Sequence, residues 1–301
     1  MDGPTFLMLT DKTNAAAICH RMIGYDFPWE INRALELAVL RTFCVPRISQ
    51  LLHNTGEFVH RPQKRYDDTS LILGNIMKWG YDSPRGEAAI AQMNRIHQRY
   101  AIHNQDFLYV LSVLIYEPVR WNQRFGWRPF TSVEKQALFN FWRVVGERMA
   151  IEDIPATYKA FQAFNQAYEA EHFCYHPSNQ VIGNAVVNLM QSWFPAIMTP
   201  LIPWGVKAVV DEPMRQALGW SQPPQILTQA ICWSLRKMRQ TLRWLPRRRQ
   251  SAFKVDEPNQ TYPVEYDIGQ LGPAHTASER PATRCPFARM QSLLGSRHQS
   301  S

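Results

Sequence analysis

Apolar side chains recur at intervals of three and four residues along most of this 301-residue chain. This interval is the period of one face of an α-helix, whereas the alternation that marks a half-buried strand is scarce. The sequence therefore predicts an all-α fold.

Residues that cap or break helices set the ends of the predicted helices. Pro46 is expected to kink or break a first helix over 32–52, and the loop that follows extends past Pro62. The acids and threonine of 67–69 suit the first turn of the next helix, which is expected to stop at Gly80. Later helices are predicted over 82–100, 105–124, 131–149, 154–171, 178–194 and 224–246.

These helices are expected to form one domain over residues 5–250. Thr131 and Glu134 have the spacing of a capping box at the start of one of them. From Ala252 onward the chain is polar and rich in proline. Residues 251–301 are therefore expected to be an extended or poorly ordered tail.

One long stretch, residues 172–206, contains no charged side chain. Three prolines interrupt its second part, so it is not expected to form a single membrane-spanning helix. It is either buried core or a surface that touches lipid. Core is favoured, because a membrane-contacting face usually carries interleaved basic residues.

The composition is that of a folded protein with a sizeable core. Hydrophobic residues make up 45% and charged residues 19% of the chain, which argues against a disordered class. The five cysteines are odd in number and form no C-x-x-C pair, so a secreted disulfide framework is not expected. The chain shows neither a signal peptide at its start nor a run of about 18 apolar residues. We therefore expect a cytoplasmic protein without a transmembrane helix.

The net charge of +8 arises from one segment. Eight basic residues and no acidic residue lie between Leu235 and Val255, so the rest of the chain is neutral overall. Because nucleic-acid binding usually needs a basic face on the fold, no nucleic-acid partner is expected. The segment 236–254 either contacts an anionic membrane peripherally, together with Leu235, Met238, Leu242 and Trp244, or is a solvated basic helix end.

A histidine is expected on the inner face of the helix over 82–100. His97 follows Met93 by four residues and precedes Tyr100 by three, and Asn94 shares this side. An inward imidazole is either a core residue bonded to a neighbour or a ligand, since neutral imidazole is the usual axial donor to haem iron.

A second polar group heads the inward stripe of the preceding helix. Arg65 and Thr69 are four residues apart and stack on one face. Thr69 is either a helix cap, with Arg65 paired to Asp67 or Asp68, or the two form a polar pair that faces a pocket and steadies a bound oxygen species.

Two Glu-x-x-His pairs leave a different chemistry open. Glu57 with His60, and Glu169 with His172, have the spacing found in di-iron helical bundles. A complete site of that kind needs two further glutamates on other helices. No nucleotide loop, zinc spacing or serine-hydrolase motif occurs in the sequence.

Several motifs, taken in order, resemble the MpaB family of oxygenases and its relatives, the latex-clearing rubber oxygenases. They are 64–69 (KRYDDT), 94–100 (NRIHQRY), 125–129 (FGWRP) and 141–146 (FWRVVG), and the resemblance covers about residues 25–220. It implies a globin-like helical core around haem b, with His97 as the proximal iron ligand. Arg65 and Thr69 match residues that lie beside the haem on its distal side, and Asn94 is expected near the cofactor.

The resemblance also implies a reaction. It indicates oxidative cleavage of a carbon–carbon double bond by dioxygen in an apolar, isoprenoid or prenylated substrate. A channel for that substrate is expected from 172–206 with Phe107, Tyr109 and Trp142. The alternatives are a di-iron oxidoreductase and a non-catalytic haem or lipid carrier.

The chain departs from the family pattern at two positions. Asp68 stands where latex-clearing proteins carry a lysine that can reach the iron, so that gating is not expected here. Glu57 is the nearest glutamate to the base assigned in some relatives, but it is displaced in sequence.

Overall fold

The computed structural model describes residues 14–244 and 248–273, and within these ranges it is entirely helical apart from turns and loops. Residues 14–21 are helical and lead into η1. The longer helices are α2 (Pro28–Thr42), α3 (Pro46–Asn54), α5 (Pro62–Trp79), α6 (Pro84–His97), α7 (Asn104–Phe125), α8 (Ser132–Arg148), α9 (Tyr158–His172), α10 (Pro177–Ser192), α11 (Ile202–Val209) and α13 (Gln225–Gln240). The shorter elements are η1 (Met22–Asp26), α4 (Glu57–His60), η2 (Thr199–Leu201), α12 (Glu212–Ala217), η3 (Thr241–Trp244), η4 (Lys254–Asp256) and η5 (Ile268–Gln270). The predicted all-α class is confirmed for these residues.

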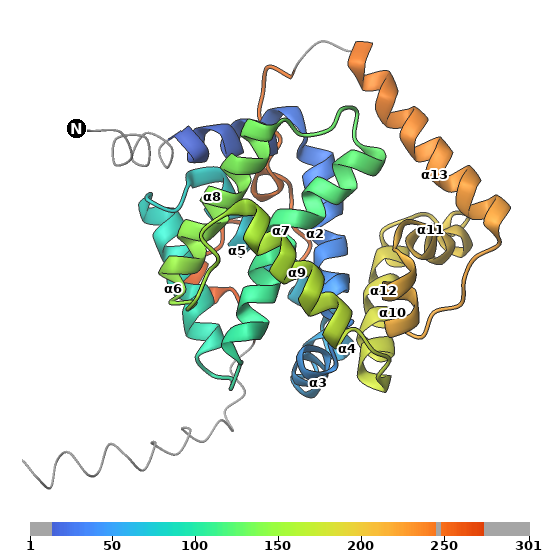
Figure 1. Cartoon of the computed structure of the whole chain (residues 1–301), viewed down its shortest axis with the longest axis horizontal. Coiled ribbons are helices and arrows are strands. Elements are labelled where there is room, and N and C mark those ends of the chain that lie inside the picture. Colours follow the sequence, from blue (N-terminus) through green and yellow to red (C-terminus); the bar gives the residue numbers. More distant parts are fainter. Residues whose placement is uncertain (1–13, 245–247, 274–301) are drawn as a thin grey trace, which may run out of the picture.

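Helices α2 and α7 pack along each other at the centre of the molecule (Figure 1). The pair α5 and α6 lies on one side of them, and α8 and α9 pack on α7. Helices α10, α11 and α12 form the other side, with α13 on the outer edge against α11 and α7. This arrangement leaves α2, α3, α5, α6 and α7 around one interior space.

Prolines set several helix starts. Pro46 begins a separate helix, α3, so the predicted break is confirmed. The helix expected to begin at 67–69 instead begins at Pro62. Proline suits the first helical position because its φ is already helical and because a backbone N–H at that position would have no partner within the helix. Asp67, Asp68 and Thr69 therefore lie in its second turn.

Capping side chains set the starts of α8 and α6. Thr131 accepts a hydrogen bond from the Glu134 backbone, and the Glu134 carboxylate accepts one from the Thr131 backbone, as a capping box requires. Ser83 caps α6, which ends at His97 rather than near Tyr100.

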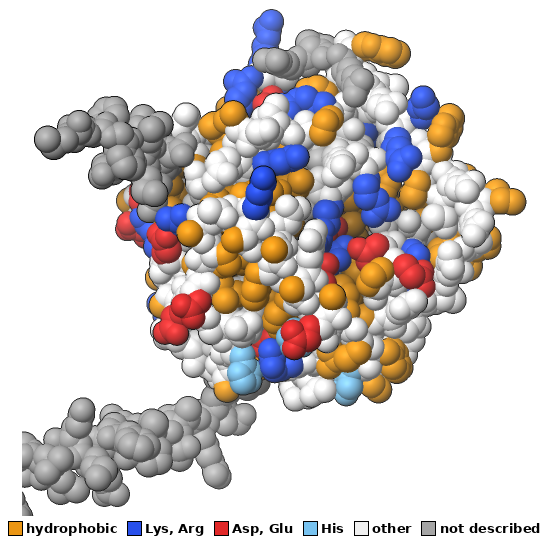
Figure 2. Space-filling view, in the orientation of Figure 1, with side chains coloured by type: hydrophobic (Ala, Val, Ile, Leu, Met, Phe, Trp, Pro, Cys, Tyr) orange, Lys and Arg blue, Asp and Glu red, His pale blue; other side chains and the backbone are white. Residues whose placement is uncertain are grey.

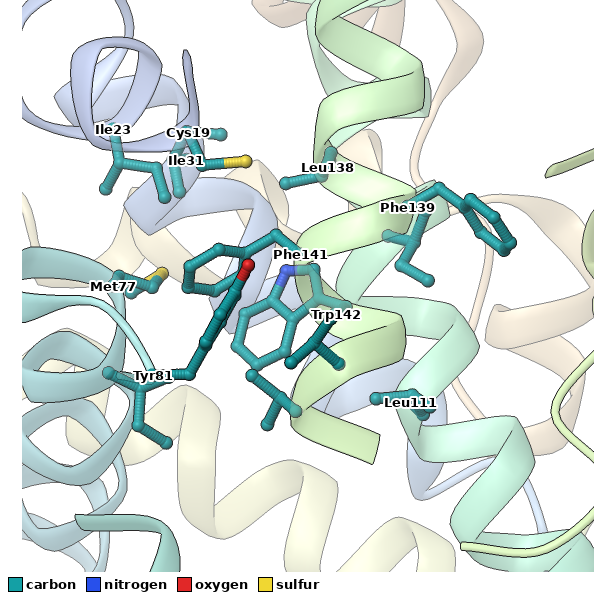
Figure 3. Packing of buried hydrophobic residues seen from close by; sticks show 14 of the residues in the cluster. Cys19, Ile23, Ile31, Met77, Tyr81, Leu111, Leu138, Phe139, Phe141 and Trp142 are labelled. Atoms are coloured by element: carbon teal, nitrogen blue, oxygen red, sulfur yellow. The ribbon is translucent and has the colours of Figure 1, made fainter. Parts of the chain in front are cut away.

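Aromatic packing joins α8 to the α5–α6 side of the core. Tyr81 lies against Phe141, with ring centroids 5.2 Å apart, and Phe141 meets Trp142 edge-on at 5.5 Å (Figure 3). Trp142 is fully buried among these residues. Such aromatic pairs fix α8 against the core that surrounds the interior space.

The uncharged stretch divides into two parts. Within α10 its apolar residues, such as Ile182 and Val187, are buried. After α10 some are exposed, with Ile197 at 86% and Leu201 at 61% of full exposure, whereas Ile202 and Val206 of α11 pack on a core cluster. The preference for core is therefore right for α10 and for part of α11, and wrong for the exposed residues between them. None of the helices in the described part of the chain is both long and apolar enough to span a bilayer.

Residues 252–273 pack on the helical body, contrary to the expected tail. Phe253 and Leu271 are buried in the main core cluster. Thr261 donates two hydrogen bonds to the Asp67 carboxylate of α5, and Gln92 of α6 donates to the Leu271 carbonyl. These distant contacts hold the polar, Pro-rich segment in place. The remaining part of the expected tail, 274–301, lies outside the described residues.

Candidate functional site

A cavity of about 310 Å³ lies between α2, α3, α5, α6 and α7, and we call it the larger cavity. Its wall is mainly aliphatic and aromatic. It also brings together the three predicted site residues His97, Arg65 and Thr69. A cavity of this size with few polar groups has the character of a small-molecule site.

His97 is the last residue of α6, and its ring faces the larger cavity beside Met93 and Ile96. The ring meets Phe107 of α7 edge-on, with centroids 5.2 Å apart. Its Nδ1 atom is buried and has no hydrogen-bond partner among the described residues. The inward position of His97 is thus confirmed. The described residues provide no hydrogen-bond partner for Nδ1, as a purely structural histidine would require.

The environment of His97 keeps the imidazole neutral. Burial, together with the positive charge of Arg65, lowers its pKa to about 4. At neutral pH the ring is therefore uncharged, which is the form that donates a lone pair to a metal. An unsatisfied buried nitrogen is costly unless a ligand occupies it.

Arg65 is a partly buried cation that forms no ion pair within the described residues, although the more distant carboxylates of Asp68 and Glu57 act on its charge. Its guanidinium bonds to the Thr69 hydroxyl and lies 5.1 Å from the Phe58 ring centroid, and Thr69 donates back to the Arg65 carbonyl at 2.9 Å. No carboxylate among the described residues lies within ion-pair distance of it. Burial lowers its pKa, but an arginine stays protonated in proteins. The larger cavity is thus prepared for an anionic group.

The pairing of Arg65 with Asp67 or Asp68 does not occur. Lys64 donates to both Asp68 carboxylate oxygens, at 2.8 and 3.1 Å, and Tyr262 donates to one at 2.6 Å. Asp67 is bonded by Thr261, as described above. The cap proposed for Thr69 is also wrong, because Thr69 lies inside α5. Both acids thus bond to residues of the 252–273 segment, although Asp68 also lines the larger cavity.

An ion pair missed by the sequence analysis lines another part of the wall. Arg47 of α3 donates to both carboxylate oxygens of Asp106 on α7, at 2.8 and 2.7 Å. Tyr168 of α9 also donates to Asp106. Hydrogen bonding to Asp106 raises the pKa of Arg47. The two charged residues are 59 positions apart, so no local pattern reveals the pair.

Other predicted residues have separate outcomes. Asn94 does not line the larger cavity, and its amide donates to the Arg148 carbonyl at 3.1 Å, so its contact braces α6 against α8. Phe107 and Trp142 line the cavity, as expected for a channel, whereas Tyr109 is fully buried behind the wall. No residue of 172–206 reaches the larger cavity.

The two Glu-x-x-His pairs do not converge on one site. Glu57 lines the larger cavity, but Arg61 donates to both of its carboxylate oxygens. Glu169 forms ion pairs of 3.0 Å with Arg41 and with Arg120. The described residues contain no group of three or more histidines, cysteines or acids that could hold a metal. The arrangement therefore does not favour the di-iron alternative.

Comparison with known proteins gives the same family as the motifs. Residues 33–244 match the profile described as "ER-bound oxygenase mpaB/B'/Rubber oxygenase, catalytic domain". The chain is 26% identical over 273 residues to ER-bound oxygenase mpaB' of Penicillium brevicompactum, an alignment that covers 84% of this chain and 64% of that protein.

Two further relatives carry the name ER-bound oxygenase mpaB. The protein of Penicillium roqueforti (strain FM164) is 26% identical over 64% of this chain and 71% of its own length. A second protein of Penicillium brevicompactum is 29% identical over 59% of this chain and 50% of its own length. The profile match spans the helices that build the larger cavity, and this chain belongs to the mpaB/rubber oxygenase catalytic-domain family.

Proposed function

We propose that this protein is a haem b-dependent oxygenase that cleaves a carbon–carbon double bond of an apolar, isoprenoid-like substrate with dioxygen. The observation that carries the proposal is the neutral, unpartnered imidazole of His97 in a mostly apolar cavity that also contains the unpaired Arg65. Membership of an oxygenase family supports the reaction class.

The residues of the larger cavity fit haem. His97 would hold the iron, and Arg65 would bind a carboxylate of the porphyrin or negative charge that develops beside it. Haem would supply the activation of dioxygen, which no side chain of the cavity can provide. The apolar wall would exclude water and orient the alkene by shape. Thr69 would hold the guanidinium of Arg65 against the cavity through their hydrogen bonds.

The visible spectrum of the purified protein tests this proposal. We expect a Soret band in the wild type and its loss, or a shifted band, in His97→Ala. His103→Ala is the matched control, because His103 also lines the larger cavity but is exposed. An unchanged band with full haem content in His97→Ala would refute the assignment of the ligand. Haem without oxygen uptake in the presence of polyisoprene oligomers would instead indicate a carrier.

We also propose that α13 contacts an anionic membrane. Its inner side packs on the body through Cys232 and Leu235, and Arg239 pairs with the buried Glu30 at 2.5 Å. Its outer side exposes Ile226 and Trp233, at 84% and 61% of full exposure. Apolar and basic side chains lie together along this edge of the molecule (Figure 2).

The structure changes which residues of this segment could contact a membrane. Leu235 faces the protein, while Met238 and Trp244 are exposed as expected, and Leu242 is half-buried. Lys237 lies on the exposed part of α13, where it would meet acidic headgroups, whereas Arg236 donates to the Arg124 carbonyl of α7.

A further inference from the structure

A second cavity of about 90 Å³, which we call the smaller cavity, lies between α2, α5 and α10. It shares five wall residues with the larger cavity, namely Val39, Phe58, Arg65, Thr69 and Leu73. The Arg65–Thr69 pair therefore lies where the walls of the two cavities meet. The histidine that we assign to the iron lines only the larger cavity.

The far wall of the smaller cavity is apolar. Val186, Leu189 and Met190 project into it from α10, on the core side of the uncharged stretch. Leu35 and Met77 complete this part of the wall. Such a surface favours an apolar ligand segment over water.

One side of the smaller cavity carries a hydrogen-bonding group. Tyr66 donates to Oε1 of Glu36 at 2.8 Å, and Arg33 donates to the same oxygen at 2.5 Å. Lys254 also lines this cavity, and its positive charge acts on the Glu36 carboxyl group. Burial raises the pKa of Glu36, and the charges of Arg33 and Lys254 and the Tyr66 hydrogen bond oppose this effect; a protonated carboxyl group can donate as well as accept.

The Glu36–Tyr66 pair is held rigidly. The Tyr66 ring contacts Trp193, with centroids 4.7 Å apart, and the Trp193 indole donates to the Gln63 side chain at 2.8 Å. Because the pair is fixed by its neighbours, Glu36 presents a stationary polar group to the smaller cavity. A rigid acceptor beside an apolar wall selects ligands by both shape and hydrogen bonding.

We infer that the smaller cavity binds one end of the apolar substrate, a short branched hydrocarbon segment that carries a hydroxyl group. The hydroxyl bonds to Glu36, the hydrocarbon packs on Val186, Leu189 and Met190, and the chain continues past Arg65 and Thr69 into the larger cavity. This inference rests on the proposed function, which places the haem and the reacting double bond in the larger cavity. It assigns α10 the role of setting substrate length.

Calorimetric titration of the full chain, as purified, with geraniol tests the inference. Met190→Trp and Val186→Phe fill the smaller cavity, and each is expected to weaken geraniol binding at least about tenfold. Met190→Leu is the matched control, because it conserves volume, and its affinity is expected within about twofold of wild type. Thermal melting identifies which filling variants are folded, and only those are titrated.

The hydroxyl contact is tested by substitution of the acid. Glu36→Leu removes the hydrogen-bonding group and is expected to weaken geraniol binding about tenfold, whereas Glu36→Gln keeps it and is expected to stay within about threefold. Wild-type affinity in both filling variants, or no geraniol binding by the wild type, would overturn the inference.

The haem content of the same samples separates this inference from the proposed function. A wild type that lacks a Soret band but binds geraniol, with loss of binding in Met190→Trp, would refute the haem assignment and support the smaller cavity as a ligand site. A wild type with haem whose filling variants bind geraniol normally would leave the oxygenase proposal standing and refute the smaller cavity.

Discussion

The positive charge of Arg65 acts on His97 within the larger cavity and adds to the effect of burial in lowering the pKa of the imidazole. The two residues come from different helices, and neither forms an ion pair within the described residues, although the carboxylates of Asp68 and Glu57 act on the charge of Arg65 from a greater distance. A cation and a neutral base exposed to the same apolar space indicate a site built for a ligand rather than for stability.

Arg65 is therefore expected to lower the stability of the ligand-free protein. Replacement of a partly buried, unpaired cation by an apolar side chain should raise the free energy of unfolding by about 1 kcal/mol or leave it unchanged, and should reduce the haem retained on purification. Urea denaturation and pigment content of Arg65→Leu measure the two effects. Lys64→Leu is the contrasting variant. It removes the ion-pair partner of the buried Asp68 and should lower the free energy of unfolding by about 3 kcal/mol. Equal losses in both variants would contradict this view of Arg65.

The raised pKa of Glu36 predicts a specific dependence of stability on pH. The folded protein holds the Glu36 proton at a higher pH than the unfolded chain does, so the stability contributed by the protonated form is lost as pH rises through the folded pKa. Glu36→Gln does not titrate. Urea midpoints measured from pH 4 to pH 8 should therefore fall in the wild type relative to Glu36→Gln as pH increases. Parallel curves would show that Glu36 titrates normally.

The segment 252–273 is expected to be part of the stable core. Phe253 is buried against Gly24, so tightly that a methyl group on that glycine would overlap the ring. Phe253→Ala should lower the free energy of unfolding by about 3–4 kcal/mol, as for other buried phenylalanines. Val264→Ala in the same segment is the control, because Val264 is exposed, and it should change stability by less than about 0.5 kcal/mol. Similar small effects in both variants would show that the segment contributes little.

Membrane contact through α13 predicts loss of vesicle binding when its outer face is made polar. The double variant Ile226→Ser, Trp233→Ser should sediment with vesicles of phosphatidylcholine and phosphatidylserine at least about tenfold less than wild type, because apolar insertion supplies most of the affinity. Val133→Ser is the control, since Val133 is equally exposed on α8, away from α13. High salt should also weaken wild-type binding. Wild-type binding by the double variant would refute this contact.

Much of the site could be predicted because it is local in sequence. The helical period placed His97 inward from its spacing to Met93, and the four-residue interval placed Arg65 with Thr69. Helix starts were less certain, since acids in 67–69 and a proline at Pro62 both favour a first turn, and the proline determined it.

The remaining features depend on contacts between distant segments. Asp68 pairs with Lys64 and not with Arg65. Tyr262 bonds to both members of this ion pair, and no local sequence pattern connects Tyr262 to α5. Glu36 looks like an ordinary polar residue on a helix, and only the approach of α5 and α10 makes it part of a cavity wall. The side chain of Asn94 donates a hydrogen bond to the Arg148 carbonyl of α8 and does not line the cavity, and no local sequence pattern predicts this contact.

The position of Gly272 and Pro273 in the wall of the larger cavity has a consequence for biosynthesis. Ala38, near the other end of the described chain, lines the same space. During synthesis this cavity thus stays open on one side until residues 252–273 dock on α5 and α6. Closure between such distant segments is slow relative to helix formation, so the wall of this cavity is completed only after its helices have formed.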